Sequence, residues 1–178
     1  DFRGYAGRIE SGLVRVGDKV TIQPQNRETT ITGIHTYDGT REEAYAGLSV
    51  TLTIADNIDI SRGDWINAAS NAADVTKTRA ADICWFNEEP LSPSRKYFIK
   101  HGTRTIAAKI PTIEYKLDIH ALEEHSAASD LKMNEIARVG LQLQHALPTD
   151  AYSDVKIGGQ FIVIDEVSNQ TLAAGMFA

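Results

Sequence analysis

Alternation of apolar and polar residues with a period of two dominates this chain. The pattern is clearest in residues 48–54, 110–117 and 138–144, where Leu, Val, Ile or Tyr occupies every second position. Because successive side chains of a strand point to opposite faces, this pattern predicts half-buried β-strands. The run Phe161–Ile164 is apolar throughout, which predicts a strand buried on both faces.

Tight-turn signals separate these segments, and glycine is suited to them because it adopts positive φ at no steric cost. Many short strands joined by such turns predict an all-β chain made of barrels or sandwiches. The best helix candidate is residues 118–129, which could equally form a loop with one helical turn. The turn signals are Gly17-Asp18, Asp38-Gly39, Gly63-Asp64 and Gly158-Gly159.

Residues 67–74 are small and polar and lack the apolar periodicity of their flanks. We interpret this stretch as part of a linker. It predicts a first domain over residues 1–68, a linker over 69–76 and a second domain over 77–178. Each domain is long enough for a small barrel.

Composition places the chain among ordinary globular proteins, with 42% hydrophobic and 24% charged residues. No apolar run approaches the roughly 18 residues that span a bilayer, and the first residues do not form a signal peptide. The chain starts without Met, so we expect a piece of a longer polypeptide. A single cysteine, Cys84, excludes an internal disulfide and fits the reducing cytoplasm. Its apolar neighbours predict that it is buried.

The net charge of −6 argues against broad binding to nucleic acid, which needs clustered cations. The densest basic stretch, Arg95–Arg104, mixes cations with aromatic residues. It could contact an anion or an acidic partner. The interpretation we favour is a hairpin whose outer face is solvated by its charges.

Motifs for chemistry are absent from the sequence. There is no Gly-x4-Gly-Lys-Ser/Thr loop, and the glycines at 4, 7 and 12 precede a strand-like segment, so they favour close strand packing. His120 and His125 lack the His-Glu-x-x-His spacing. Residues 56–59 resemble only part of a calcium loop, and Ser11 lies outside a nucleophile elbow. We therefore predict no catalytic, cofactor-binding or metal-binding residue in this chain.

Several segments resemble known proteins. Residues 2–20, with Gly17-Asp18, and residues 43–52 and 60–64 resemble the second domain of translational GTPases such as elongation factor Tu. Several short sequence motifs, spread over essentially the whole chain, are similar to those of the large subunit of bacterial sulfate adenylyltransferase. The segments that carry this likeness are residues 2–7, 58–64, 102–105, 131–139, 158–165, 169–171 and 173–176.

The resemblance implies two consecutive β-barrels, like domains 2 and 3 of elongation factor Tu. It also implies a parent enzyme that converts ATP and sulfate to adenosine 5′-phosphosulfate and pyrophosphate, for cysteine synthesis, with help from GTP hydrolysis. GTP and Mg²⁺ would be bound by an N-terminal GTPase domain, whose motifs are absent here. The adenylyl-transfer residues would belong to a small catalytic subunit.

The barrels would then support the GTPase domain and contact the small subunit, without nucleic acid or membrane as partners. Arginine favours interfaces because its planar guanidinium donates several hydrogen bonds. An alternative is a translation-factor fragment that binds aminoacyl-tRNA, and a third is an unrelated β-barrel interaction protein. The candidate contacts with the small subunit are Arg3, Arg8, Arg95, Lys96 and Arg104.

Overall fold

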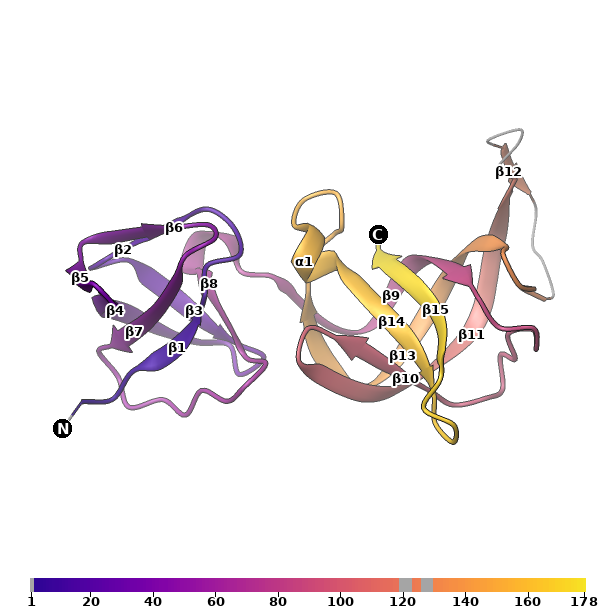
Figure 1. Ribbon diagram of the computed structural model, residues 1–178, viewed down its shortest axis with the longest axis horizontal. Coiled ribbons are helices and arrows are strands. Elements are labelled where there is room, and N and C mark those ends of the chain that lie inside the picture. The colour runs from indigo at the N-terminus through magenta and orange to yellow at the C-terminus, as the bar shows by residue number, and fades with distance from the viewer. Residues whose placement is uncertain (1, 119–122, 126–129) are drawn as a thin grey trace. The chain divides into compact units, whose positions relative to one another are not determined.

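The computed structural model describes residues 2–118, 123–125 and 130–178 (Figure 1). Internal contacts divide the chain into two compact units, Asp1–Ala73 and Asp74–Ala178. Each unit consists of strands wrapped around its own hydrophobic core. The prediction of an all-β chain with two consecutive barrels is confirmed.

The first unit contains eight strands and one short 3₁₀ helix, η1. Five strands form the path β1-β7-β4-β3-β8, β5 pairs with β4, and β2 pairs with β6 as a separate ribbon. The ribbon is tied back to the sheet, since the amide of Gly17 donates to the carbonyl of Ile31 at 2.8 Å. The elements are β1 (Tyr5–Arg8), β2 (Leu13–Arg15), β3 (Lys19–Gln23), β4 (Arg27–Thr36), β5 (Gly39–Arg41), β6 (Glu43–Tyr45), β7 (Ser49–Ile54), β8 (Trp65–Ala68) and η1 (Ala69–Asn71).

Alternation along β7 explains how this barrel closes around its core. Val50 and Leu52 are buried, whereas Ser49 and Thr51 lie on the outer face. The β4–β5 hairpin encloses Tyr37 and Asp38, and Gly39 supplies the positive φ of +124° that the turn requires. The buried apolar residues are Val20, Ile22, Ile31, Ile34, Ala44, Val50, Leu52 and Ile58.

In the second unit, six strands close into a barrel in the order β10-β14-β15-β9-β13-β11, because β11 also pairs with β10. β12 extends this sheet by pairing with the end of β11. The elements are β9 (Asp74–Trp85), β10 (Tyr97–His101), β11 (Arg104–Asp118), β12 (Glu123–His125), β13 (Ile136–Thr149), α1 (Lys156–Gly159), β14 (Gln160–Asp165) and β15 (Thr171–Phe177).

The core of the second barrel is made by the inward-facing side chains of all six strands. Trp85 lies edge-to-face against Tyr97, with ring centroids 5.9 Å apart, and its indole N–H donates to the carbonyl of Glu89 at 2.8 Å. A buried indole therefore keeps a hydrogen-bond partner. The largest fully buried side chains are Trp85, Tyr97, Phe177, Ile83, Ile99, Ile110, Leu131 and Leu147.

Three local predictions need correction. The expected linker over residues 69–76 includes the start of β9, where residues 74–76 pair with residues 147–149 of β13. The helix or loop expected over 118–129 is wrong where it is described, because β12 pairs with residues 116–118 of β11. The other residues of that segment, His120 among them, lie outside the described part of the chain. Strand pairing outweighs local propensity at both places.

The third correction concerns Phe161–Ile164 in β14. Phe161 and Val163 are buried, at 4% and 0% exposure, but Ile162 and Ile164 remain partly exposed on the outer face. This strand is therefore buried on one face only. None of the helices in the described ranges has the length and apolar content of a bilayer-spanning segment.

Candidate functional site

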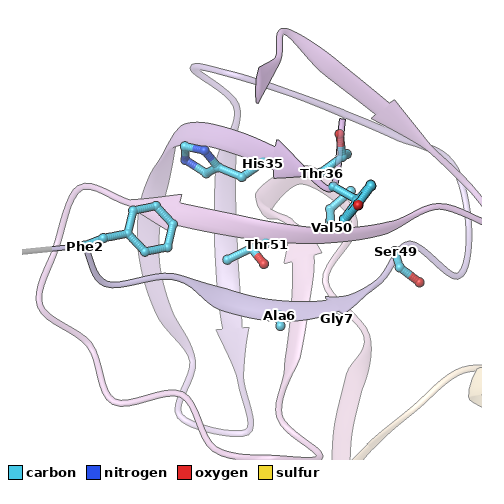
Figure 2. A pocket seen from close by; sticks show the side chains of 9 residues that line it. Phe2, Ala6, Gly7, His35, Thr36, Ser49, Val50 and Thr51 are labelled. Atoms are coloured by element: carbon cyan, nitrogen blue, oxygen red, sulfur yellow. The ribbon is translucent and has the colours of Figure 1, made fainter. Parts of the chain in front are cut away.

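A shallow hollow lies on the outer face of the first barrel, over strands β1, β7 and β4 (Figure 2). The three strands pair side by side, with Ala6 opposite Thr51 and Thr51 opposite His35. Because strand side chains alternate, these three residues share the outer face. The hollow has a volume of about 740 Å³ and is lined by Phe2, Ala6, Gly7, His35, Thr36, Tyr37, Ser49, Val50 and Thr51.

Aromatic rings define one wall of the hollow. Phe2 packs edge-to-face against His35, with ring centroids 5.0 Å apart, as both side chains in Figure 2 indicate. Gly4 permits this packing, because a Cβ there would lie 2.4 Å from Cγ2 of Thr51 and 2.9 Å from Phe2. Tyr37 is fully exposed. Since no carboxylate, lysine or cysteine lines it, the hollow offers a surface for packing and hydroxyl hydrogen bonds.

Sequence reasoning did not identify this hollow. The two rings of its wall, Phe2 and His35, are 33 positions apart in the chain. The available signal was weak: His35 and Thr51 each occupy the polar positions of an alternating strand. Only the β4–β7 register places them next to each other.

Two predicted contact residues lie at β1 in this barrel, Arg3 before the strand and Arg8 at its end. Arg3 is held in place, because its guanidinium contacts Asn57, pairs with the carboxylate of Asp59 at 2.7 Å and lies 5.7 Å from the ring of Tyr5. Arg8 ends β1 opposite Ser49 and is exposed. Arg8 therefore lies at the edge of the hollow, whereas Arg3 braces the loop that carries Asp59.

The other three predicted contact residues lie at the β10–β11 hairpin of the second barrel. Arg95 bonds to the carboxylates of Asp165 and, at 3.1 Å, Glu89, and it stacks 5.8 Å from the ring of Tyr97. Arg95 is thus part of the barrel's own structure. Lys96 is exposed, and Arg104 lies opposite His101 across the hairpin. The predicted hairpin is confirmed from residue 97 onward, but Arg95, expected on a solvated face, is paired with Glu89 and Asp165.

Histidine and cysteine side chains do not form a centre for chemistry in the described ranges. His101 is buried, and its Nδ1 lies 2.8 Å from the carbonyl oxygen of Gln160. Burial lowers the pKa of His101, so its ring is held neutral at the pH where ordinary histidines titrate. Cys84 is half-buried on β9, more exposed than its apolar neighbours suggested. Over residues 2–118, 123–125 and 130–178, no group of three or more potential metal ligands comes together.

Comparison with known proteins gives two family matches. The family described as elongation factor Tu domain 2 matches residues 5–66, which cover most of the first barrel. The family described as GTP-eEF1A C-terminal domain-like matches residues 78–178, more than half of the chain.

Among curated relatives, the chain is 42% identical over 176 residues to sulfate adenylyltransferase subunit 1 of Aliarcobacter butzleri. It is 43% identical over the same length to the subunit 1 of Vibrio vulnificus. These matches cover 99% of this chain and 37% of each relative, so the chain spans little more than a third of their length. The predicted resemblance to this subunit is confirmed.

Solved structures agree on the fold. Sup35 complexed with GDP matches with a TM-score of 0.85 and 18% identity, over 99% of this chain and 45% of that one. Apo SelB from Methanococcus maripaludis matches with a TM-score of 0.77 and 18% identity, over 97% and 38% of the two chains. At such identities the likeness concerns the fold alone. By the match over residues 78–178, the chain belongs to the GTP-eEF1A C-terminal domain-like family.

Proposed function

We propose that this chain is the two-barrel region of the GTP-hydrolysing regulatory subunit of a sulfate adenylyltransferase. The parent complex would convert ATP and sulfate to adenosine 5′-phosphosulfate and pyrophosphate. The barrels would support a GTPase domain and contact the small catalytic subunit. The observation that carries this proposal is the identity of about 42% to sulfate adenylyltransferase subunit 1 along nearly the whole chain.

The chemistry of the described side chains supports the division of labour in this proposal. The described residues offer a packing hollow and internally paired arginines, with no assembled metal ligands. In this proposal, GTP and Mg²⁺ are held by a GTPase domain, and adenylyl transfer occurs on the small subunit. The single cysteine, Cys84, supports a cytoplasmic location.

Calorimetry tests the contact with the small subunit. The 178-residue chain is titrated with the purified small catalytic subunit of a sulfate adenylyltransferase at micromolar concentration, and saturable binding is expected. Titration with GTP and Mg²⁺ is the matched control and should give no binding heat. Absence of binding to the small subunit would contradict the proposed contact, and tight GTP binding would contradict the division of labour.

A translation-factor fragment that binds aminoacyl-tRNA is the alternative. The fold of Sup35 and SelB is compatible with it, whereas the higher identity to sulfate adenylyltransferase subunit 1 and the net charge of −6 weigh against it. Filter binding with aminoacyl-tRNA at low and moderate salt separates the two. Retention that persists at moderate salt would favour the alternative.

A further inference from the structure

The outer surface of the second barrel is polar on one side and apolar on another. Along β13, the outward residues Arg138, Gly140 and Gln142 alternate with buried Val139 and Leu141. This is the ordinary pattern of a barrel strand that faces water. Along β14, by contrast, both outward residues in the middle of the strand are isoleucines, Ile162 and Ile164.

Neighbouring strands continue this apolar surface. Ile164 pairs with Phe98 of β10, and Ile162 pairs with Ala174 of β15, which in turn pairs with Cys84 of β9. All five side chains are partly exposed. Strands β10, β14 and β15 run side by side in Figure 1. We call this surface the apolar panel: Phe98, Ile162, Ile164, Ala174 and Cys84.

Exposing an apolar panel of this kind to water costs free energy, and the panel plays no part in the barrel's own core. The core is already filled by the inward residues of the same strands, such as Ile99 and Val163, which are both 0% exposed. Strands that are apolar on both faces are typical of sheets covered on both faces. Contiguous exposed apolar surface marks sites of protein–protein contact. The panel therefore has the features of a surface that favours contact with another polypeptide.

Cations without partners border the panel on the β10 side. Lys100 pairs across the sheet with Ile162, and Lys96 comes just before β10; both are exposed. Neither lysine makes a hydrogen bond or ion pair with any residue in the described ranges. Two arginines of this barrel are paired, Arg95 with Asp165 and Arg138 with Asp82 at 2.5 and 2.8 Å, whereas Lys77 and Lys109 also lack a partner in the described ranges. Unpaired lysines beside an apolar surface are complementary to a partner that presents carboxylates.

We propose that the apolar panel is the docking face for a second protein subunit, which places apolar side chains over Ile162 and Ile164 and carboxylates beside Lys96 and Lys100. This inference rests on the proposed function, because the relatives are named subunit 1 of an enzyme. It adds the location: the face lies on β10, β14 and β15, and of the five predicted contact residues only Lys96 borders it.

The test uses three double variants of the 178-residue chain and the small catalytic subunit as the probe. Ile162→Thr with Ile164→Thr makes the panel polar and keeps the β-branched shape that suits a strand. Lys96→Glu with Lys100→Glu reverses the charge beside it. Lys77→Glu with Lys109→Glu is the control, since both lysines are exposed on the same barrel away from the panel. Calorimetry gives the Kd of each, and thermal unfolding verifies that each is folded.

Both panel variants are expected to raise the Kd at least tenfold, while the control stays within about twofold of the wild type. The charge variant should also lose part of the salt dependence of binding. If the wild type binds and neither panel variant changes the Kd, the docking face lies elsewhere and this inference is overturned. If the wild type does not bind, the proposed contact between subunits is itself wrong.

Sedimentation of the chain alone distinguishes a second copy as the occupant. The wild type is expected to sediment as a monomer. Self-association that disappears in the Ile162→Thr and Ile164→Thr variant would mean that the panel pairs with itself, and it would overturn the inference.

Discussion

The carboxylate of Asp165 forms an ion pair with the guanidinium of Arg95, which lies 70 residues earlier in the chain. The same carboxylate accepts hydrogen bonds from the backbone amides of Val167 at 2.7 Å and Ser168 at 2.8 Å. It thereby orders the β14–β15 turn and fastens the segment before β10 to it. The amides of Ser168 and Val167, together with Arg95, lower the pKa of Asp165.

Asp165→Asn is expected to lower the urea midpoint of the second barrel at pH 7 more than Arg95→Gln does. In Asp165→Asn the neutral amide oxygen accepts the two backbone hydrogen bonds more weakly and the ion pair is lost, whereas Arg95→Gln leaves the charged carboxylate and both backbone bonds in place. Circular dichroism during urea unfolding measures both midpoints. Equal midpoints for wild type and Asp165→Asn would contradict the role of this carboxylate.

Lowering the pH should remove the contribution of Asp165 to the stability of the second barrel. Its pKa is lower in the folded than in the unfolded state, so the unfolded state binds a proton first as the pH falls. The stabilisation is complete above the ordinary aspartate pKa of roughly 3.9 and is lost as the pH falls through the lower folded value. The stability difference between wild type and Asp165→Asn should shrink over that window. A difference that stays constant from pH 6 to pH 2 would argue against this linkage.

His101 should make the second barrel less stable below neutral pH. Burial lowers its pKa, so the unfolded state binds a proton at higher pH than the folded state does. Stability therefore falls as the pH decreases from about 6.5 to the lower folded pKa. Urea unfolding between pH 7.5 and 5 should show this fall in the wild type, and less of it in His101→Gln. Identical slopes in the two proteins would exclude His101 as the cause.

Inner and outer isoleucines of the second barrel should differ in their effect on stability. Ile99→Ala removes a 0% exposed side chain from the core and is expected to cost about 3 kcal/mol. Ile162→Ala, on the partly exposed outer face, should cost about 1 kcal/mol or less. The free energy of unfolding in urea measures both. A cost for Ile162→Ala that matches Ile99→Ala would place Ile162 in the core of the isolated chain.

Two glycines near the hollow provide a matched pair. A Cβ at Gly4 would lie 2.4 Å from Thr51 and 2.9 Å from Phe2, whereas a Cβ at Gly7 would meet nothing within 4 Å. Gly4→Ala is expected to destabilise the first barrel by about 1–2 kcal/mol, and Gly7→Ala by less than about 0.5 kcal/mol. Thermal unfolding compares the stabilities of the two variants, and the NMR proton chemical shifts of His35 should change only in Gly4→Ala. The opposite ranking would contradict the close approach at Gly4.

Much of the fold was predictable because the deciding signals are local. The alternation in residues 48–54 and 138–144 corresponds to β7 and β13, and Asp38-Gly39 lies at the β4–β5 hairpin. The family likeness was carried by short segments spread along the chain. The start of β9 at Asp74 and strand β12 were missed, because they exist only through pairing with distant residues.

The sequence by itself determined most of the strands and several of the tight turns, since periodicity and residue type act over a few neighbours. Tertiary structure alone decided what those strands present outward. Phe161–Ile164 reads as apolar throughout, but barrel closure buries only Phe161 and Val163 and leaves Ile162 and Ile164 beside Phe98. The hollow with Phe2 and His35 likewise depends on strand register. Register and closure join residues far apart in the chain, which no local pattern encodes.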